Sequence, residues 1–222
     1  MAQTGINKQT RVVLFDHDGT LIDSESVHFR LWQHVLDNYD VVLNHAFHDQ
    51  KMAGIPVDQN AVDLVEHLNL SVPASQLAKE KHALTREFLN EQAFPLMPDA
   101  ASAVQQVFEQ GYTIGIVTGG SRQSVDQTLS QHGFDKWISV VVAVEDVAQS
   151  KPAPDCYLQA LSKLGISAEQ AVSVEDTMYG MQASLSAHIP CVVIPTPNSA
   201  AHDFTGAAAR YDSLTQWLQA EL

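Results

Sequence analysis

The sequence predicts an α/β protein with a doubly wound parallel sheet and an all-helical segment inserted after the first strand. Three observations lead to this fold class. Short apolar runs rich in β-branched residues alternate with helical patterns along most of the chain. These runs are continuous rather than alternating with polar residues, which is typical of strands buried on both faces of a parallel sheet. One stretch, residues 24–94, breaks the rhythm and contains helical patterns only.

The core elements are expected in a regular strand and helix order. The first strand is VVLF, residues 12–15, and the later strands are Ile114–Val117, Ile138–Ala143, Ala171–Val174 and Cys191–Ile194. Helical patterns begin near an Asp, Ser or Pro and have apolar residues three and four apart. They cover Ala100–Gln110, Ser121–His132, Pro154–Leu164 and Met178–Ala187. This repeated order predicts a Rossmann-like core.

The inserted segment is expected to form a separate helical cap. Its helices are predicted at Glu25–Asn38, Asp58–Leu68 and Ala74–Asn90, with a turn-rich segment at His48–Pro56. This is too much helix for a simple crossover between two strands. We therefore expect an α/β catalytic core domain of residues 1–23 and 95–222, and a helical cap domain of residues 24–94.

Composition excludes several classes of partner. The 222 residues are 45% hydrophobic, which suits a packed globule, and their formal charge is -14. Such a charge repels phosphate backbones and anionic lipids, so we expect no nucleic acid and no membrane surface as partner. No segment has the apolar length of a membrane span or a signal peptide core. Cys156 and Cys191 lack metal-type spacing and fit reduced thiols in a cytoplasmic protein.

Polar residues follow the first expected strand directly, in the sequence Asp16-His17-Asp18-Gly19-Thr20. Ligands of an open parallel sheet bind beyond the carboxyl ends of its strands. If the chain stays extended, the period of two places the carboxylates of Asp16 and Asp18 on one side and His17 on the other. The alternative is a hairpin turn at Asp-Gly, which would need a second strand that the next residues do not provide.

Two further motifs follow later strands. In IGIVTGGSR, Thr118 and Gly119 precede a helix start, where a hydroxyl and backbone N–H groups suit an anion. Glycine here is also compatible with a simple turn. In QSKPAPD, Lys151 leaves a rigid proline-rich turn, although a surface lysine before a helix is the ordinary interpretation.

The fourth motif is Glu175-Asp176 in AVSVEDTMYG, again after a buried strand. Adjacent acids at this point can cap the following helix. Together with Asp16 and Asp18 at the same sheet edge, however, they would repel one another unless a cation lies among them. Hard oxygen ligands in a phosphate site indicate Mg²⁺.

The four motifs and the helical insert together resemble the haloacid dehalogenase superfamily, over essentially the whole chain. The matching signatures are DHDGT, Thr118, Lys151 in KPAPD, and Glu175-Asp176 with Gly180 shortly after. The cap after the first motif and the SKPAPD and ED variants look like the β-phosphoglucomutase and small-phosphatase branch. The resemblance implies a hydrolase that works through an aspartyl phosphate.

The resemblance also implies a role for each motif. Asp16 is the expected nucleophile, and Asp18 the acid and base that serves the leaving alkoxide and the attacking water. Thr118, Gly119 and Lys151 are expected to bind phosphate. The expected Mg²⁺ ligands are Asp16, the backbone carbonyl of Asp18, Asp176, and Glu175 directly or through water.

Cap residues are expected to contribute to substrate binding. The resemblance points to Lys51 and Gly54 in the turn-rich segment. His28, on the first cap helix, is placed to hydrogen-bond Asp18 or to pack as an interface histidine. Further along are three basic residues that fit a solvated helix face as well as they fit substrate binding: Lys79, Lys81 and Arg86.

The resemblance therefore implies a Mg²⁺-dependent phosphatase that acts on a small phosphorylated metabolite, with a sugar phosphate as the expected class. It also implies a monomer, the default for capped members. The alternative is a phosphohexomutase of the β-phosphoglucomutase type, which must hold a second phosphate. Gly54 is followed by Ile-Pro-Val-Asp and Thr118 by Gly-Gly. These residues lack the basic groups expected of a mutase, although Ser121 and Arg122 keep that alternative open. A regulatory protein without activity would have lost a catalytic group, and none of those expected is missing.

Overall fold

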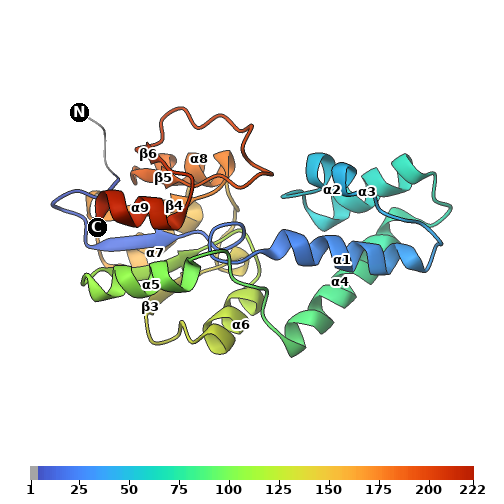
Figure 1. The fold of residues 1–222 in the computed structure, drawn as a ribbon, viewed down its shortest axis with the longest axis horizontal. Coiled ribbons are helices and arrows are strands. Elements are labelled where there is room, and N and C mark those ends of the chain that lie inside the picture. Colours follow the sequence, from blue (N-terminus) through green and yellow to red (C-terminus); the bar gives the residue numbers. More distant parts are fainter. Residues whose placement is uncertain (1–4) are drawn as a thin grey trace. The chain divides into compact units, whose positions relative to one another are not determined.

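The computed structural model describes residues 5–222. The chain divides into two compact units: the residues up to Asp23 together with Phe94–Leu222, and the segment Ser24–Ala93. The first unit is the α/β core and the second is helical (Figure 1). This division differs by one residue from the boundary expected after residue 94.

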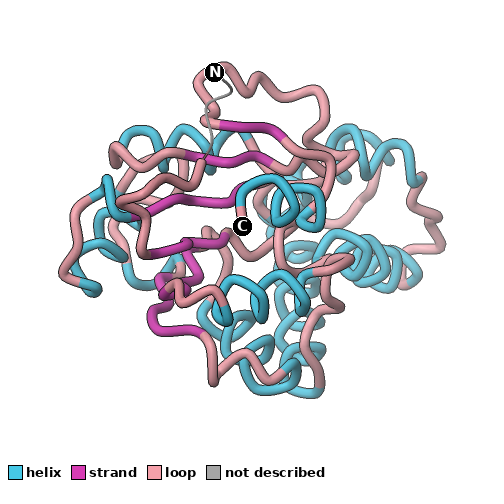
Figure 2. Tube along the Cα trace, turned by 60° about the vertical axis from the view of Figure 1, so that its left-hand side comes forward, coloured by secondary structure: helices cyan, strands magenta, loops and turns pink. Residues whose placement is uncertain are grey.

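The core is built on one six-stranded sheet, whose strands are magenta in Figure 2. Its pairings are all parallel. The strands, in the spatial order β3-β2-β1-β4-β5-β6, are Ile138–Val142, Thr113–Val117, Val12–Phe15, Ala171–Glu175, Cys191–Val193 and Ala209–Arg210. The chain first builds outward from β1 through β2 and β3 and then returns to β4 on its other side. This reversal creates the crevice in which doubly wound sheets bind ligands. The expected fold class is therefore confirmed.

Helices cover both faces of this sheet, so β1 is buried on both sides. Val13 and Phe15 pack in the apolar cluster that includes α5 (Ala100–Glu109) and α9 (Leu214–Glu221). Val12 and Leu14 point the opposite way, into the cluster that includes α7 (Asp155–Leu164) and α8 (Met178–Ser186). The period of two in a strand explains this division, and it accounts for the continuous apolar run of β1.

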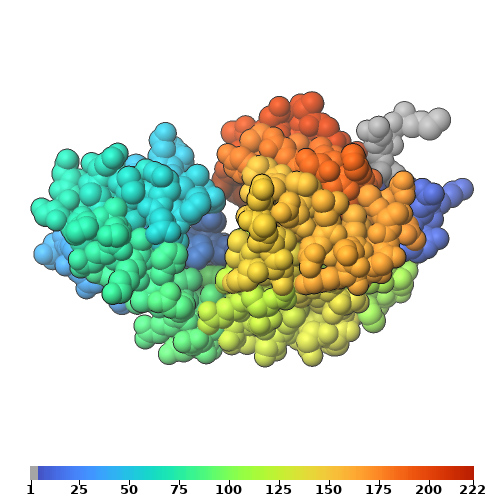
Figure 3. All heavy atoms as spheres, turned by 180° about the vertical axis from the view of Figure 1, so that it is seen from behind, coloured from blue at the N-terminus to red at the C-terminus, as the bar shows by residue number. Residues whose placement is uncertain are grey.

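Two elements at the C-terminal end were not expected. β6 is only two residues long, and α9 begins after Ser213, whose side chain accepts the N–H of Gln216. The remaining core helix, α6 (Arg122–His132), begins after Ser121, which accepts the N–H of Ser124 in the same way. In the space-filling view the segments from β3 to the C-terminus, yellow to red, form adjoining parts of the core surface (Figure 3).

The helical unit has its own apolar core. It consists of α1 (Ser24–Asp37), α2 (His45–Lys51), α3 (Val57–Leu68) and α4 (Ala74–Glu91). Buried side chains such as Trp32, Leu64 and Leu77 form one cluster within it. A turn-rich segment was expected at residues 48–56, but residues 48–51 form the second half of α2. This helix begins after Asn44, whose side chain caps it by accepting the N–H of Phe47.

Across residues 5–222, no helix combines the length and the apolar character that crossing a bilayer requires. Cys156 and Cys191 are both buried and are free thiols.

Candidate active site

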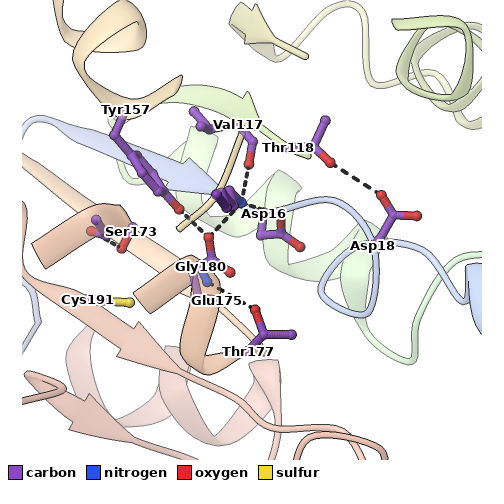
Figure 4. A network of polar contacts seen from close by, with 12 residues as sticks. Asp16, Asp18, Val117, Thr118, Tyr157, Ser173, Glu175, Thr177, Gly180 and Cys191 are labelled. Atoms are coloured by element: carbon purple, nitrogen blue, oxygen red, sulfur yellow. Dashed lines mark hydrogen bonds and ion pairs between the residues drawn. The ribbon is translucent and has the colours of Figure 1, made fainter. Parts of the chain in front are cut away.

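The four motifs meet where β1, β2 and β4 end. The backbone N–H of Asp16 donates to the carbonyl of Val174, and that of Thr118 donates to Val142, so each residue continues the ladder by one position. Glu175 is the last residue of β4 and Asp176 follows it. Since neighbouring parallel strands end at one edge of the sheet, these side chains lie together. Figure 4 shows Asp16, Thr118 and Glu175 at this edge.

Lys151 lies at the centre of this group. Its ammonium nitrogen donates to Asp16 Oδ1 (2.5 Å), to Glu175 Oε1 (2.7 Å) and to the carbonyl of Val117 (2.8 Å). Only 9% of the Lys151 side chain is exposed, and both carboxylates are buried. The two neighbouring carboxylates outweigh the cost of burial and raise the pKa of Lys151 above its usual range, so it is charged. The lysine is therefore not the surface residue that its position before a helix also allowed.

Three carboxyl groups form a buried cluster with the chemistry of a metal site. Each of Asp16, Glu175 and Asp176 offers an oxygen, and these oxygens lie within 4.8 Å of one another. Burial raises the pKa of Asp16 to about 8 despite the opposing charge of Lys151. Burial, followed by the charges of Asp16 and Glu175, raises that of Asp176 well above its usual value. When all three acids are ionised, three carboxylates and one ammonium leave two negative charges, which one divalent cation balances. The residues therefore fit a metal ion such as Mg²⁺.

Two glycines permit this close arrangement of acids. At Gly180, in the first turn of α8, an added Cβ would lie 1.8 Å from Glu175 Oε2. At Gly19 it would lie 2.3 Å from Asp176 Oδ2, and the positive φ of 77° there also favours glycine. Neither position accepts a side chain unless an acidic group of the cluster moves.

Asp18 has a different environment from Asp16. Its carboxylate accepts a long hydrogen bond of 3.3 Å from the hydroxyl of Thr118, and its side chain is 38% exposed. The Thr118 oxygen in turn accepts the N–H of Gly120 at 2.8 Å. Gly119 beside it is exposed. The partly exposed Asp18 can therefore exchange protons, whereas Asp16 is enclosed.

His17 lies on the other side of the chain, as the period of two predicts. It is fully buried, and its Nε2 lies 3.0 Å from the hydroxyl of Thr128 in α6. A tight turn follows, in which the N–H groups of Leu21 and Ile22 both donate to the carbonyl of His17. The short bridge between Asp18 and Ile22 is parallel, so the motif does not form the hairpin that was the alternative.

Tyr157 is a site residue that the sequence reasoning missed. It belongs to α7, is fully buried, and its hydroxyl donates to Glu175 Oε1 at 2.5 Å. Its ring centroid lies 5.4 Å from the Lys151 nitrogen. Burial, and then the charge of Glu175, raise the pKa of Tyr157 well above its usual value, so the phenol remains a donor. In the sequence it is one apolar position of a helix, with no signal of its own.

Ser121 and Arg122, the residues that kept a mutase possible, have structural partners. Ser121 caps α6. The guanidinium of Arg122 donates to the Asp146 carboxylate and to the carbonyl of Val141. Its backbone N–H donates to Glu145. Arg122 therefore fastens the start of α6 to the segment that follows β3.

The expected cap residues belong to the helical unit and are described within it. His28 Nδ1 lies 3.0 Å from the Lys81 nitrogen. Gly54 has a positive φ of 72°, and its N–H donates to Glu25 Oε1 at 2.9 Å. Lys51 ends α2 and is exposed.

The basic residues near Lys81 in the sequence allowed a solvated helix face, but Lys81 does not lie on one. It is fully buried, hydrogen-bonds Thr85 at 2.9 Å and lies 5.5 Å from the Trp32 ring centroid. Burial lowers its pKa to about 8, against the opposing charge of Glu25.

A parallel doubly wound core with a helical insert and this acid and lysine cluster defines a class of hydrolases. The sequence pattern of the haloacid dehalogenase-like hydrolases matches residues 13–194, and the chain belongs to that family. The resemblance inferred from the motifs is thus confirmed.

Particular relatives extend over most of the chain. Hexitol phosphatase B of Escherichia coli is 29% identical over 212 residues, covering 94% of this chain and 95% of its own. The fructose-1-phosphate phosphatase of Escherichia coli is 28% identical over 183 residues, covering 81% and 94%. A haloacid dehalogenase family hydrolase from Deinococcus radiodurans, solved with bound phosphate and sodium, has the same fold. Its TM-score is 0.79 at 22% identity, with 96% of each chain covered.

Proposed function

We propose that this chain is a Mg²⁺-dependent phosphatase that hydrolyses a small phosphate monoester through an aspartyl phosphate on Asp16. The observation that carries the proposal is the contact of Asp16 with Lys151 inside a cluster of three buried carboxyl groups. A nucleophilic carboxylate, a fixed ammonium and a cation site in one crevice are the groups that phosphoryl transfer needs.

The main obstacle to the reaction is charge. At about 4 Å and an effective dielectric of about 20, each pair of like unit charges costs about 4 kcal/mol. The Lys151 ammonium, 2.5 Å from Asp16 Oδ1, lowers this cost for a phosphate that approaches the same carboxylate. The carboxylates of Asp16, Asp176 and Glu175 and the carbonyl of Asp18 would hold Mg²⁺, which supplies two further positive charges when bound.

Two half-reactions follow. In the first, a carboxylate oxygen of Asp16 bonds to phosphorus, the bond from phosphorus to the ester oxygen breaks, and Asp18 gives its proton to the leaving alkoxide. In the second, Asp18 takes a proton from water, which attacks phosphorus and releases Asp16 and inorganic phosphate. The partial exposure of Asp18 and its contact with Thr118 support this exchange of protons.

The phosphoryl oxygens are assigned to Thr118, the Gly119 N–H and Lys151. Thr118 is buried at the end of β2 with its hydroxyl toward Asp18, and Gly119 is exposed beside it. Both precede α6, whose N-terminus favours negative charge. The helical unit is assigned the recognition of the leaving group, with His28, Lys51 and Gly54 as its candidate residues.

A phosphorylated sugar or sugar alcohol is the proposed class of substrate. Hexitol phosphatase B and the fructose-1-phosphate phosphatase match most of this chain, and both act on such phosphates by name. The alternative phosphohexomutase needs cationic groups for a second phosphate. Arg122, the candidate near Thr118, is already bound to Asp146 and Val141, which favours the phosphatase.

A hydrolysis screen tests the proposal. Purified protein with Mg²⁺ is offered a panel of sugar, sugar-alcohol and aryl phosphate monoesters, and released phosphate is measured, with Asp16→Asn as the blank. We expect hydrolysis that EDTA and Asp16→Asn both abolish. Hydrolysis that persists in Asp16→Asn would refute the nucleophile. Conversion of β-glucose 1-phosphate to glucose 6-phosphate, primed by the bisphosphate, would favour the mutase.

A further inference from the structure

The ammonium group of Lys151 has no proton left for a phosphate. A lysine ammonium has three N–H donors. In the structure they go to Asp16, Glu175 and the Val117 carbonyl, at 2.5, 2.7 and 2.8 Å. To donate to a phosphoryl oxygen while staying at this position, Lys151 must release one of these three acceptors.

Glu175 is the acceptor best prepared for that release. Its Oε1 accepts from Lys151 and also from the hydroxyl of Tyr157. Of the two carboxylates on Lys151, Glu175 alone receives a second side-chain donor among residues 5–222. A buried carboxylate oxygen that loses its last donor pays most of its desolvation cost, whereas one that keeps a donor does not.

Tyr157 holds its hydroxyl at a fixed place. The side chain is fully buried in the apolar cluster formed by α7, α8 and the sheet. Figure 4 shows the Tyr157 hydroxyl directed at Glu175. The ring lies 5.4 Å from the Lys151 nitrogen, within the range of a cation–π contact. The ring and the hydroxyl therefore act on different partners and can be tested separately.

We propose that Tyr157 is a positioning residue whose hydroxyl keeps Glu175 hydrogen-bonded while Lys151 turns from Glu175 to a phosphoryl oxygen. This inference rests on the proposed function, since it gives Lys151 a phosphate to bind. Without the hydroxyl, Lys151 could turn only by leaving Glu175 Oε1 without a donor. Tyr157→Phe should therefore weaken phosphate binding.

The test is the affinity for inorganic phosphate, measured by calorimetry at saturating Mg²⁺. We expect Tyr157→Phe to bind phosphate about tenfold more weakly than the wild type, the effect of losing one hydrogen bond to a charged group. In hydrolysis the same variant should show a raised KM with a smaller change in kcat, because the contact serves substrate and transition state alike. Unchanged phosphate affinity would overturn the proposal.

A matched control separates the position from the substitution. The hydroxyl of Tyr211 also donates to a glutamate, Glu221 Oε1, at 2.9 Å. Tyr211→Phe should leave phosphate affinity unchanged. Tyr157→Leu removes the ring as well as the hydroxyl. If it weakens phosphate binding and Tyr157→Phe does not, the ring is responsible and the proposal is wrong.

Two other results have distinct meanings. If Tyr157→Phe lowers the Mg²⁺ affinity but not the phosphate affinity at saturating Mg²⁺, Tyr157 supports the metal ligand and not the turning of Lys151, so the proposal fails. If the wild type neither binds phosphate nor hydrolyses any monoester, the proposed function fails first. Thermal unfolding without ligands verifies that each variant is folded.

Discussion

Gly180→Ala is predicted to destabilise the protein, although helix propensity predicts the opposite. Gly180 lies in α8, where alanine is favoured over glycine by about 1 kcal/mol. The new Cβ, however, would lie 1.8, 2.1 and 2.3 Å from the three carboxyl atoms of Glu175, too close for a small adjustment. The carboxylate must move away from Lys151 and Tyr157, with which it forms hydrogen bonds of 2.7 and 2.5 Å. At about 1.5 to 3 kcal/mol for each bond to a charged group, and with the propensity gain subtracted, the net loss is about 2 to 5 kcal/mol.

The assay is urea unfolding followed by circular dichroism, without Mg²⁺, so that only the protein's own contacts are measured. Gln182→Ala, at an exposed position of the same helix, is the control, because it changes propensity without a clash. It should lie within about 0.5 kcal/mol of the wild type. A Gly180→Ala protein as stable as the wild type, or more stable, would show that Glu175 is not held as described.

Three further predictions concern separate parts of the molecule. Mg²⁺ should raise the thermal unfolding midpoint of the wild type, because it balances the charges of the buried acids, and Asp176→Asn should remove most of this rise. An equal rise in the wild type and the variant would show that the ion binds elsewhere. Lys81→Met tests whether the lysine charge is buried in the helical unit. The pKa of Lys81 is 10.5 in the unfolded chain and about 8 in the folded protein, so the unfolded state binds more protons between these pH values. Wild-type stability should therefore rise relative to the variant by up to about 3 kcal/mol over this window in urea unfolding, and parallel curves would contradict the burial of the charge. Arg122→Ala should lower the free energy of unfolding by about 1 to 2 kcal/mol, because the contacts with Asp146 and Val141 are lost, while KM for the substrate changes less than about twofold. A large rise in KM would show that Arg122 binds the substrate.

The parts of the fold that the sequence predicts are those with a strong periodic signal. β1 has the predicted bounds because four apolar residues buried on both faces are followed at once by Asp16. β6 is too short to show a pattern, and its position depends on pairing with β5. The start of α2 was missed because Gly54 and Pro56 dominate the local signal, whereas the helix depends on the cap at Asn44.

The same limit applies to the site. Asp16, Thr118, Lys151 and the Glu175-Asp176 pair can be predicted because they follow strands whose ends must meet. Tyr157 could not be predicted, since its role depends on how α7 packs against the sheet. For Lys81 the sequence left a solvent-exposed helix face as an equal alternative, because a charged side chain by itself predicts exposure. Its burial depends on contacts with Trp32 of α1 and with Thr85, one turn further along α4.

The measurement that tests the central claim most directly is the chemical trapping of the phosphoenzyme. A substrate found in the hydrolysis screen is mixed with the enzyme and Mg²⁺, and the reaction is stopped with acid within one turnover. Borohydride then reduces any aspartyl phosphate to homoserine, which peptide mass spectrometry locates. We predict homoserine at position 16, dependent on Mg²⁺ and on substrate. An active enzyme that shows homoserine at Asp18, at Asp176 or at no position would contradict Asp16 as the nucleophile.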